Sequence, residues 1–587
     1  AIILKGAPVD EGAVCGLFTA KGMIQSRIIE TSRYRVLLYR KILIPEENDA
    51  VHGDVGIYPV GTMIYKFLSP RMSCLRLLED ILDNKVDYDA FCGHFVTIIQ
   101  EGDSIQLLCD PLGQYNLFFS KDCSLISSSF LSVVYGLKSV TLNRWALIEN
   151  LLGGIIIGSD TIFNEIKKAT GNWPVDLNGI KILRPRRNCE DVFSDKVNKH
   201  SQDEEVRRQL DILKEYFKKL EGWLNGRKVA IGMTGGHDSR LLLGMLLETG
   251  AIPVIHTHPR KIEDADLKAA RLICRSLGIE PIIPEVIFTE DMDEKTTFET
   301  MKEAMVYKDG LVRLSHYWFQ QYNTITYRRK VLGGADVAMD GIGGEQYRNE
   351  ETFTGRLSME DFIKYYIFPI NVEVVFTNKI QINEFIDTLK TKLIHLLGIP
   401  SAGRIVDRQL FKRYQNEVFI PAGRGLNISC DNQLTYFLSP FADARVSLPA
   451  YRASDSLGLG LRFEQKMITR LNPDLAAIPS NDGFDFLKGE GWKRLIKRYG
   501  KILVPRSIIY RRNSRILIGQ SVEPYLGKLL NENRIIQESV DRVRKLKLPI
   551  RFSMLLKREG TAQLVAGIGF LLLYLEAKIN IDDQELD

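Results

Sequence analysis

Residues 234–239 are the stretch best suited to chemistry, with the order Thr-Gly-Gly-His-Asp-Ser after an apolar run of strand length. Glycines have no Cβ and accept positive φ, so the backbone N–H groups of Gly235 and Gly236 can approach an anion closely. Thr234 and Ser239 add hydroxyl groups, and the leucines that follow predict a helix whose positive end faces the same point. This order of strand, tight turn and helix start predicts a phosphate site.

The carboxylate of Asp238 narrows the chemistry of that site. The turn lacks the Lys-Ser/Thr ending of a Walker A loop, which disfavours an ordinary kinase or ATPase. A carboxylate beside phosphates is repulsive unless a cation lies between them, and Mg²⁺ held by one carboxylate and substrate phosphates is the usual solution. Asp238 is therefore expected to hold Mg²⁺. The structural alternative is a strand–turn–helix corner in which Asp238 only caps the helix.

A second apolar run enters a glycine-rich turn with a carboxylate at 337–348. Alone, such a turn is more often a structural loop than a site. Paired with the first it gains weight, because two strand-end turns that each offer a carboxylate can hold Mg²⁺ over a triphosphate from both sides. Asp238 and Glu345 are therefore expected to be catalytic metal ligands. The residues expected to bind the phosphates are Thr234, Gly235, Gly236, Asp238, Ser239, Gly341, Gly343 and Gly344.

The stretch 234–239 resembles the Ser-Gly-Gly-x-Asp-Ser pyrophosphate loop of the ATP pyrophosphatases, which cut ATP into AMP and pyrophosphate. Together, 234–239 and 341–345 resemble the two signature turns of the asparagine synthetase branch. That branch includes β-lactam synthetase and the macrolactam-forming cyclases of lasso peptides. That branch has a Gly-x-Gly-x-Asp turn, in which Glu345 takes the place of the Asp. Weaker matches lie at 264–270, like an Asp-Glu-x-x-x-Ala helix, and at 439–445, like Val-Pro-Phe-Leu-Asp. The resemblance covers roughly 205–500.

The resemblance implies that ATP adenylates a carboxylate, releasing pyrophosphate, and that an amine then attacks the acyl-adenylate. Screening the repulsion between the two negatively charged partners with Mg²⁺ is the electrostatic core of the first step. If the amine belongs to the substrate itself, the product is a ring. ATP and Mg²⁺ are therefore the expected cofactors, and the expected substrate is a small molecule or peptide with a carboxylate and an amine, in natural-product biosynthesis.

Two departures from the family concern catalytic residues. Ile342 stands where β-lactam synthetases have a polar member of a catalytic pair, and it cannot move a proton. The family's late lysine has no clean counterpart; Lys488 is taken as the catalytic candidate and Lys493 as a second, against the alternative that both are solvated surface charges. The residues that could line an acceptor pocket are Asp309, Arg313 and His316.

The first 140 residues predict a β-rich, sandwich-like domain. Two of its stretches, 93–96 and 110–118, resemble the glutaminase domain of the same enzymes, and 127–130 matches a Ser-containing strand. The predicted strands are 14–18, 34–43, 95–99, 105–108 and 117–119.

The glutaminase chemistry itself is expected to be lost. A working enzyme needs a Cys at the mature N-terminus, where the free α-amine is the base, but fourteen residues precede Cys15. Residues 61–63, Gly-Thr-Met, stand where a glutamine-gripping Asn-Gly-Glu would lie, and the His-Arg-Gly-Pro-Asp motif is missing. Cys15 is therefore expected to be structural, and ammonia from glutamine is not the expected nitrogen source.

The later elements predict a doubly wound parallel sheet. Residues 201–204 have capping-box form before a helix to 224, and strands at 229–232, 253–255 and 281–283 alternate with helices at 240–249 and 264–276. Ligands bind at the carboxyl ends of such strands. The expected fold is α/β plus α+β. An Ntn-hydrolase-like sandwich and connector occupy 1–200, and a PP-loop synthetase domain, helical after 355, occupies 201–587.

The composition is that of an ordinary soluble globular protein. Hydrophobic residues make up 45%, and a net charge of +5 over 587 residues argues against a dedicated nucleic-acid binder. Eight cysteines form no Cys-x-x-Cys pair, no signal peptide is recognisable, and the apolar run 564–575 is too short to span a bilayer. These features predict a cytoplasmic protein without membrane contact. The sequence leaves open whether it forms a homo-oligomer or has a partner protein.

Two other functions stay open at this point. A glutamine-hydrolysing asparagine synthetase would need Cys15 exposed by cleavage. A non-catalytic nucleotide-binding scaffold could keep the fold, although Asp238 and Glu345 at the family's metal positions argue against it.

Overall fold

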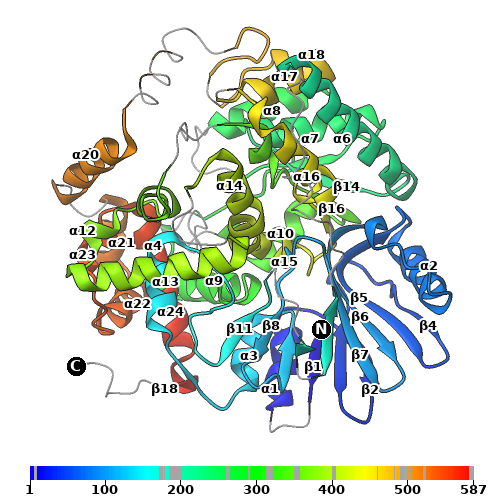
Figure 1. The fold of residues 1–587 in the computed structure, drawn as a ribbon, viewed down its shortest axis with the longest axis horizontal. Coiled ribbons are helices and arrows are strands. Elements are labelled where there is room, and N and C mark those ends of the chain that lie inside the picture. Colours follow the sequence, from blue (N-terminus) through cyan, green and yellow to red (C-terminus); the bar gives the residue numbers. More distant parts are fainter. Residues whose placement is uncertain are drawn as a thin grey trace.

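The protein is a mixed α/β chain with both antiparallel and parallel sheets, seen here in a computed structural model (Figure 1). Within the described residues the strands form two six-stranded sheets, a four-stranded parallel sheet and one two-stranded pair. The structure describes residues 1–5, 9–170, 176–177, 179–183, 201–258, 265–287, 291–311, 321–349, 357–399, 405–458, 460–481, 483–489, 496, 500, 504–519 and 524–580.

The two six-stranded sheets form the N-terminal part of the chain. The first has the order β11-β8-β9-β1-β3-β2 and is antiparallel. Its strands are β1 (Ile2–Leu4), β2 (Gln25–Glu30), β3 (Arg35–Tyr39), β8 (Phe118–Ser120), β9 (Leu125–Ser127) and β11 (Ile166–Lys168). The second has the order β12-β13-β7-β6-β5-β4. Its strands are β4 (Ala50–His52), β5 (Val55–Tyr65), β6 (Phe91–Glu101), β7 (Ser104–Cys109), β12 (Asp176–Leu177) and β13 (Ile180–Leu183).

The inner faces of these two sheets pack on each other. Alternate residues such as Val36 of β3 and Val96 of β6 share one buried cluster, because successive strand residues point to opposite faces. Helices α1 (Glu11–Ala20) and α3 (Phe130–Gly136) cover the outer face of the first sheet, and α2 (Pro70–Leu82) covers that of the second. The result is a layered order of helix, sheet, sheet and helix, which agrees with the predicted sandwich.

One predicted strand, 14–18, is wrong, because these residues lie inside α1. The Asp10 side chain accepts a hydrogen bond from the Ala13 N–H and caps the helix, while Val14, Leu17 and Phe18 bury one helical face. The other N-terminal strand predictions overlap β3, β6, β7 and β8. An apolar run of five residues is compatible with both a strand and a helix. The helix forms here because Asp10, outside the run, caps it.

The parallel sheet has the order β15-β14-β16-β17. Its strands are β14 (Val229–Gly232), β15 (Val254–His256), β16 (Val337–Met339) and β17 (Tyr436–Leu438). The chain leaves β14 for β15 on one side and later places β16 on the other, so the strand order reverses between β14 and β16. In doubly wound sheets the crevice beyond the carboxyl ends at such a point is where ligands bind. The predicted strand 281–283 contributes only an isolated bridge from Ile282 to His256.

Helices cover both faces of the parallel sheet. One face packs against α6 (Gln202–Leu224), α7 (His237–Glu248) and α8 (Ala265–Ser276), and the other against α9 (Glu294–Tyr307) and α10 (Ile325–Leu332). The predicted capping box of α6 is present, since Ser201 and Glu204 bond reciprocally.

The rest of the chain is mainly helical, as predicted. Its longer helices include α13 (Lys379–Leu397), α17 (Arg462–Leu471), α20 (Arg506–Gly519), α22 (Arg534–Arg544) and α24 (Glu559–Tyr574). The apolar run 564–575 lies almost wholly in α24 and is largely buried, and in the described part of the chain no helix has both the length and the apolarity to cross a membrane.

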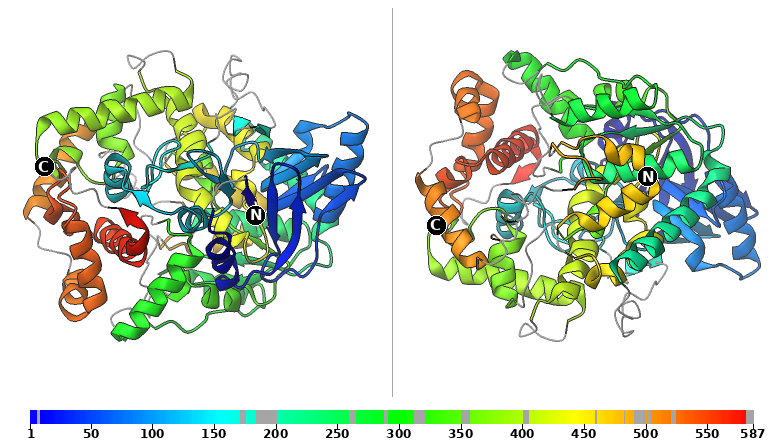
Figure 2. Two further views of the ribbon diagram at one scale, coloured as in Figure 1. Left: turned by 90° about the horizontal axis from the view of Figure 1, so that it is seen from below. Right: turned by 90° about the horizontal axis from the view of Figure 1, so that it is seen from above.

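The N-terminal and C-terminal parts share a hydrophobic core. The largest buried cluster joins residues of α3 and α4 (Arg144–Gly153) to residues of α13, α22 and α24. In addition, β10 (Val140–Thr141) pairs in parallel with β18 (Ile579–Asn580). The blue strands and the orange and red helices nevertheless lie at opposite ends of the molecule in both views of Figure 2. The domain boundary predicted at residue 200 stays a prediction. At least one hydrophobic core contains residues from both sides of it.

Candidate functional site

The two glycine-rich turns meet beyond the carboxyl ends of β14 and β16. A Cβ added at Gly344 would lie 2.0 Å from Oδ1 of Asp238, and one at Gly341 would lie 2.6 Å from Cβ of Asp238. Real Cβ atoms do not approach so closely, so only glycine lets the second turn pack on Asp238. The structure therefore brings the two turns into direct contact, as their sequence pattern predicted.

Two carboxylates and two arginines form the charged centre of this crevice. Asp238 pairs with Arg348, whose Nε lies 3.6 Å from Oε2 of the fully buried Glu464. Glu345 pairs with Arg424 at 3.1 Å. Burial raises the pKa of Asp238 to about 6, opposed by the positive charge of Arg348 and reinforced by the negative charge of Glu345. Burial acts on Glu345 as well, but Arg424 and Arg348 hold its pKa below the usual value.

The donor set of this crevice fits a hard divalent cation. Oδ1 of Asp238 is buried and has no hydrogen-bond partner, which is costly for a carboxylate oxygen unless a cation or donor reaches it. Within the described residues no three His, Cys, Asp or Glu side chains come together to enclose a metal ion. A cation bound here would take one or two protein carboxylates and complete its shell with phosphate oxygens and water, which is the usual pattern for Mg²⁺.

The first turn is built to receive anionic oxygens. Helix α7 begins after Gly236 without a side-chain cap, so its first N–H groups are not covered by a capping side chain. The hydroxyls of Thr234 and Ser239 lie 3.1 Å apart beside it. The N–H of Gly235 donates to Oδ1 of Asp266 at 2.9 Å, so this turn binds a carboxylate oxygen in the present structure. The alternative in which Asp238 only caps α7 is excluded, because the capping position is Gly236.

Asp266, from the weaker sequence match at 264–270, bonds this turn directly. The segment 478–484, near which the late lysine was expected, is also hydrogen-bonded to it. Buried Arg240 donates to the carbonyls of Leu475 at 3.0 Å and Ile478 at 2.5 Å. The Asn481 N–H donates to the Gly235 carbonyl at 3.2 Å.

Lys488 itself faces solvent. Its side chain is 88% exposed, and Nζ lies 3.4 Å from Oδ2 of Asp485. It lines a surface groove with residues of α6 and α17. Its predicted catalytic role stays a prediction, and Lys493 lies outside the described residues.

Of the three residues predicted to line an acceptor pocket, Arg313 and His316 lie outside the described residues. Asp309 is buried, and its Oδ1 accepts from Nζ of Lys21 at 3.0 Å. It also accepts hydrogen bonds from the hydroxyl of Ser129 and from the N–H of Phe130. Asp309 therefore ties α9 to the N-terminal sandwich.

Three further side chains hold the second turn, and only one of them, Lys412, lies outside the stretches that the sequence singled out. Buried Lys412 donates to the carbonyls of Glu345 at 3.4 Å and Arg348 at 3.1 Å. Asp340 accepts from the Ser439 hydroxyl at 2.7 Å and from the Ile342 N–H at 3.0 Å, and burial raises its pKa to about 7. Ser439 belongs to the fourth sequence match, which thus contacts the second turn.

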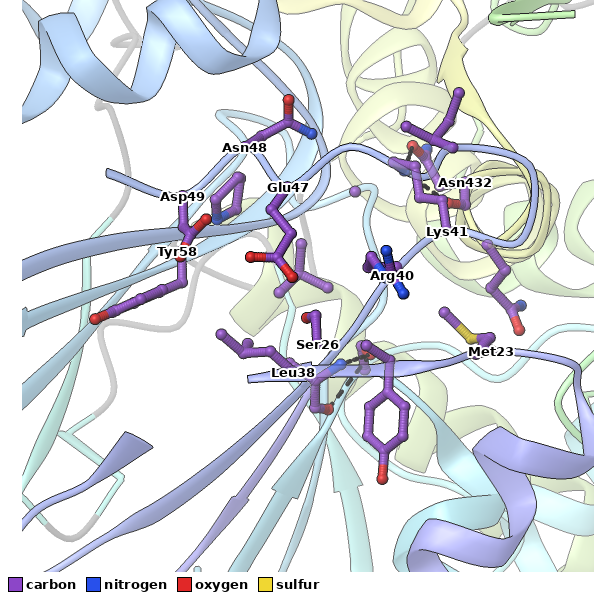
Figure 3. A pocket seen from close by; sticks show the side chains of 18 of the residues that line it. Met23, Ser26, Leu38, Arg40, Lys41, Glu47, Asn48, Asp49, Tyr58 and Asn432 are labelled. Carbon is purple, nitrogen blue, oxygen red and sulfur yellow. Dashed lines mark hydrogen bonds between the residues drawn. The ribbon is translucent and has the colours of Figure 1, made fainter. Parts of the chain in front are cut away.

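A separate cavity of about 100 Å³, partly open to solvent, lies at the end of the sandwich (Figure 3). Nζ of Lys41 donates to the Asn432 carbonyl at 2.6 Å, and Arg40 and Glu47 project into the space. Burial lowers the pKa of Lys41 to about 7. Gly61 and Met63, from the stretch that replaces the glutamine grip, also line it, whereas none of its lining residues is a cysteine.

We expect no glutamine hydrolysis from this cavity. Cys15 lies in the middle of α1 and packs against the core around that helix, so its thiol is not presented to a ligand in the cavity. Incubation with glutamine should release glutamate at the background rate, and Cys15→Ala should not change that rate. Glutamate release well above background that Cys15→Ala abolishes would contradict this expectation.

No protein-family model and no curated protein matches this chain.

Proposed function

We propose that this chain is an ATP-dependent, AMP- and pyrophosphate-forming ligase that adenylates a substrate carboxylate and joins it to an amine without using glutamine. The observation that carries the proposal is the contact between the two glycine-rich turns at the point where the strand order reverses, with Asp238 and Glu345 in one crevice. The parallel sheet supports a PP-loop synthetase domain, and the helix–sheet–sheet–helix layers support an Ntn-type ancestry for the N-terminal part.

In this proposal the triphosphate lies against the N-terminus of α7, where Thr234 and Ser239 add hydroxyl donors. Mg²⁺ bound by Asp238 and Glu345 would supply positive charge against the phosphates. Arg348 and Arg424, which screen the two carboxylates in the structure, turn to phosphate oxygens when the nucleotide binds. The crevice thus lowers the repulsion between ATP and an incoming carboxylate.

The reaction then has two balanced steps. A substrate carboxylate oxygen bonds to the α-phosphorus of ATP, and the bond from that phosphorus to its bridging oxygen breaks, so pyrophosphate leaves with the electron pair. An amine nitrogen then bonds to the acyl carbon, AMP leaves, and the nitrogen loses one proton to solvent. Ile342 has no titratable group, so it takes no proton in the second step.

Neither alternative function is favoured by an observation. A glutamine-dependent asparagine synthetase would need a cysteine at its glutaminase cavity, and none lines the one described. A scaffold without turnover would gain nothing from the buried, unpartnered oxygen of Asp238. A substrate with its own amine, such as a peptide, agrees best with the apolar Ile342 at the centre of the second turn.

Pyrophosphate release tests this proposal. The protein is incubated with ATP and Mg²⁺ together with aspartate and ammonia, with a β-amino acid, or with peptides that carry a free carboxylate and a free amine. We expect only the peptides to stimulate release, with a product one water lighter than the peptide. Strong stimulation by aspartate and ammonia would contradict the substrate assignment, and no stimulation across a broad peptide set would contradict the ligase itself.

A further inference from the structure

Helix α17 packs beside α7 (Figure 1) and reaches both glycine-rich turns through three consecutive buried residues, Phe463, Glu464 and Gln465. The ring of Phe463 lies nearly parallel to that of Tyr347 in the second stretch, with the ring centroids 6.4 Å apart. Nε2 of Gln465 lies 3.2 Å from Nε2 of His237, the first residue of α7. One helix thus contacts both turns, and Glu464 is the charged residue between its two contacts.

The backbone that carries Arg348 is fixed beside this helix. The N–H of Asn349 donates to the Gly460 carbonyl at 2.9 Å, and the N–H of Gly460 donates to the Asn349 carbonyl at 3.1 Å. Nδ2 of Asn349 donates to the Gly458 carbonyl at 2.9 Å. Lys412 donates to the carbonyl of Arg348 itself. The Arg348 side chain therefore leaves the backbone at a point that is anchored to the segment just before α17.

The guanidinium of Arg348 lies between two carboxylates. Its Nη2 contacts Oδ2 of Asp238, and its Nε lies 3.6 Å from Oε2 of Glu464. A guanidinium carries its N–H donors in a planar fork, so its two edges can serve different acceptors. The side chain of Asp238 is 27% exposed, whereas that of Glu464 is 0% exposed. A ligand in the crevice can therefore take Asp238 from Arg348, while Glu464 stays beside the guanidinium.

The burial of Glu464 favours a lasting contact with Arg348. Taking a carboxylate out of water is unfavourable unless opposite charge and hydrogen bonds compensate for the lost hydration. If Arg348 swung away from α17, Glu464 would stay buried and would lose a neighbouring positive charge. The guanidinium is therefore held at the wall of the crevice even after Asp238 has found another partner.

We propose that Glu464 is a positioning residue of this crevice: it holds Arg348 at the crevice wall, so that the guanidinium meets a phosphate oxygen of ATP when Asp238 binds Mg²⁺. The inference rests on the proposed ligase function. Glu464 touches neither the nucleotide nor the reacting carboxylate, and it acts through Arg348. This role gives α17 a function at the site, although the helix carries none of the sequence motifs.

Binding of a nucleotide that cannot react tests this role separately from catalysis. In α,β-methylene-ATP a carbon replaces the bridging oxygen that would leave with pyrophosphate, so its affinity in the presence of Mg²⁺ is measured by calorimetry on the full chain without a peptide. Glu464→Gln keeps the shape of the side chain and removes its charge. We expect binding to weaken about tenfold or more, as when a hydrogen bond to a charged group is lost. Charge alone predicts the opposite result, because removing a negative charge near a triphosphate strengthens its binding.

Two comparisons show whether the loss passes through Arg348. In the Arg348→Gln background, Glu464→Gln should no longer weaken binding, because residues that act as a unit are not additive. The matched control is Glu149→Gln on α4. Nζ of Lys392 lies 2.9 Å from a carboxylate oxygen of Glu149, which is 1% exposed, and 3.0 Å from one of Asp160, which is 25% exposed. This repeats the arrangement around Arg348 on helices that belong to a different hydrophobic core, so Glu149→Gln should bind the analogue as the parent does.

The outcomes separate the role of Glu464 from the ligase function. Glu464→Asp keeps the charge but draws it back by one methylene, so binding should weaken by about threefold, and this variant replaces Glu464→Gln if that protein does not fold. Unchanged or tighter binding in a folded Glu464 variant, or an equal loss in the Arg348→Gln background, would overturn the positioning role and leave the ligase function standing. If the parent protein does not bind the analogue with Mg²⁺, the ligase function itself is overturned, and the positioning role with it.

Discussion

Replacing Asp238 by Asn is expected to lower ATP–pyrophosphate exchange by about 10²-fold or more, roughly 2.7 kcal/mol of barrier, while the protein still folds. Asn keeps the size of the side chain and removes its charge, so the second turn still packs on it but a cation loses a ligand. The side chain is 27% exposed and Arg348 keeps Glu464 as a neighbour, so the stability cost should be small. Exchange is measured across a Mg²⁺ titration with an active peptide.

The pH dependence gives this prediction a second readout. Burial raises the pKa of Asp238 to about 6, so the carboxylate is charged above that pH and neutral below it. Parent exchange should therefore fall as pH drops through about 6. A raised carboxylate pKa makes the folded state bind the proton more tightly than the unfolded state, so this group stabilises the fold as pH falls. Lost exchange in that range is then not caused by unfolding through Asp238.

A matched control separates the site from a general loss of charge. Asp203 on α6 accepts from Nζ of Lys466 at 2.8 Å and its side chain is 63% exposed, so Asp203→Asn should exchange at the parent rate. Glu345→Gln should reduce exchange as Asp238→Asn does. If both site variants exchange at the parent rate with unchanged Mg²⁺ dependence, the site with two carboxylates does not exist as described.

The part of the site that could be predicted from sequence is the part with a local signature. A turn that needs glycine after an apolar run marks where a strand ends. Two such turns approach each other when their strands are neighbours in a parallel sheet, as β14 and β16 are. This logic found Asp238 and Glu345. Helix α6 was predictable for the same reason, since its capping box lies within four consecutive residues.

The residues that screen the two carboxylates could not be predicted, because long-range pairing leaves no periodic pattern. Arg424 lies at the end of a π-helix that contains Pro421, and propensity gives no reason to continue a helix there. Lys412 occupies the preceding helix, where its spacing is that of any basic surface residue, yet it is 3% exposed. Arg348 was part of the second stretch, but only the fold turns it toward Asp238.

The substitution Gly344→Ala is expected to have the second large effect, on both stability and exchange. A Cβ at this position would lie 2.0 Å from Oδ1 and 2.5 Å from Cγ of Asp238, so the turn or the carboxylate must move. Gly344 is not among the glycines with positive φ, so Ala suits the backbone and the effect is steric. Gly344→Ala should cost about 1–3 kcal/mol of unfolding free energy, as overpacked sites do. Exchange should fall about 10²-fold, because a displacement near 1 Å in a catalytic array has that cost.

Gly222 in α6 provides the matched control for this substitution. A Cβ there meets no atom within 4 Å, and the residue lies in the helix. Gly222→Ala should therefore stabilise the fold by up to about 1 kcal/mol and leave exchange unchanged. Gly341→Ala, whose Cβ would lie 2.6 Å from Cβ of Asp238, should behave like Gly344→Ala. Parent-like exchange in both would mean that contact between the turns does not hold Asp238 in its active position. If the exchange rate of a folded variant falls by more than its fraction of unfolded protein accounts for, the contact between the turns has a role in catalysis.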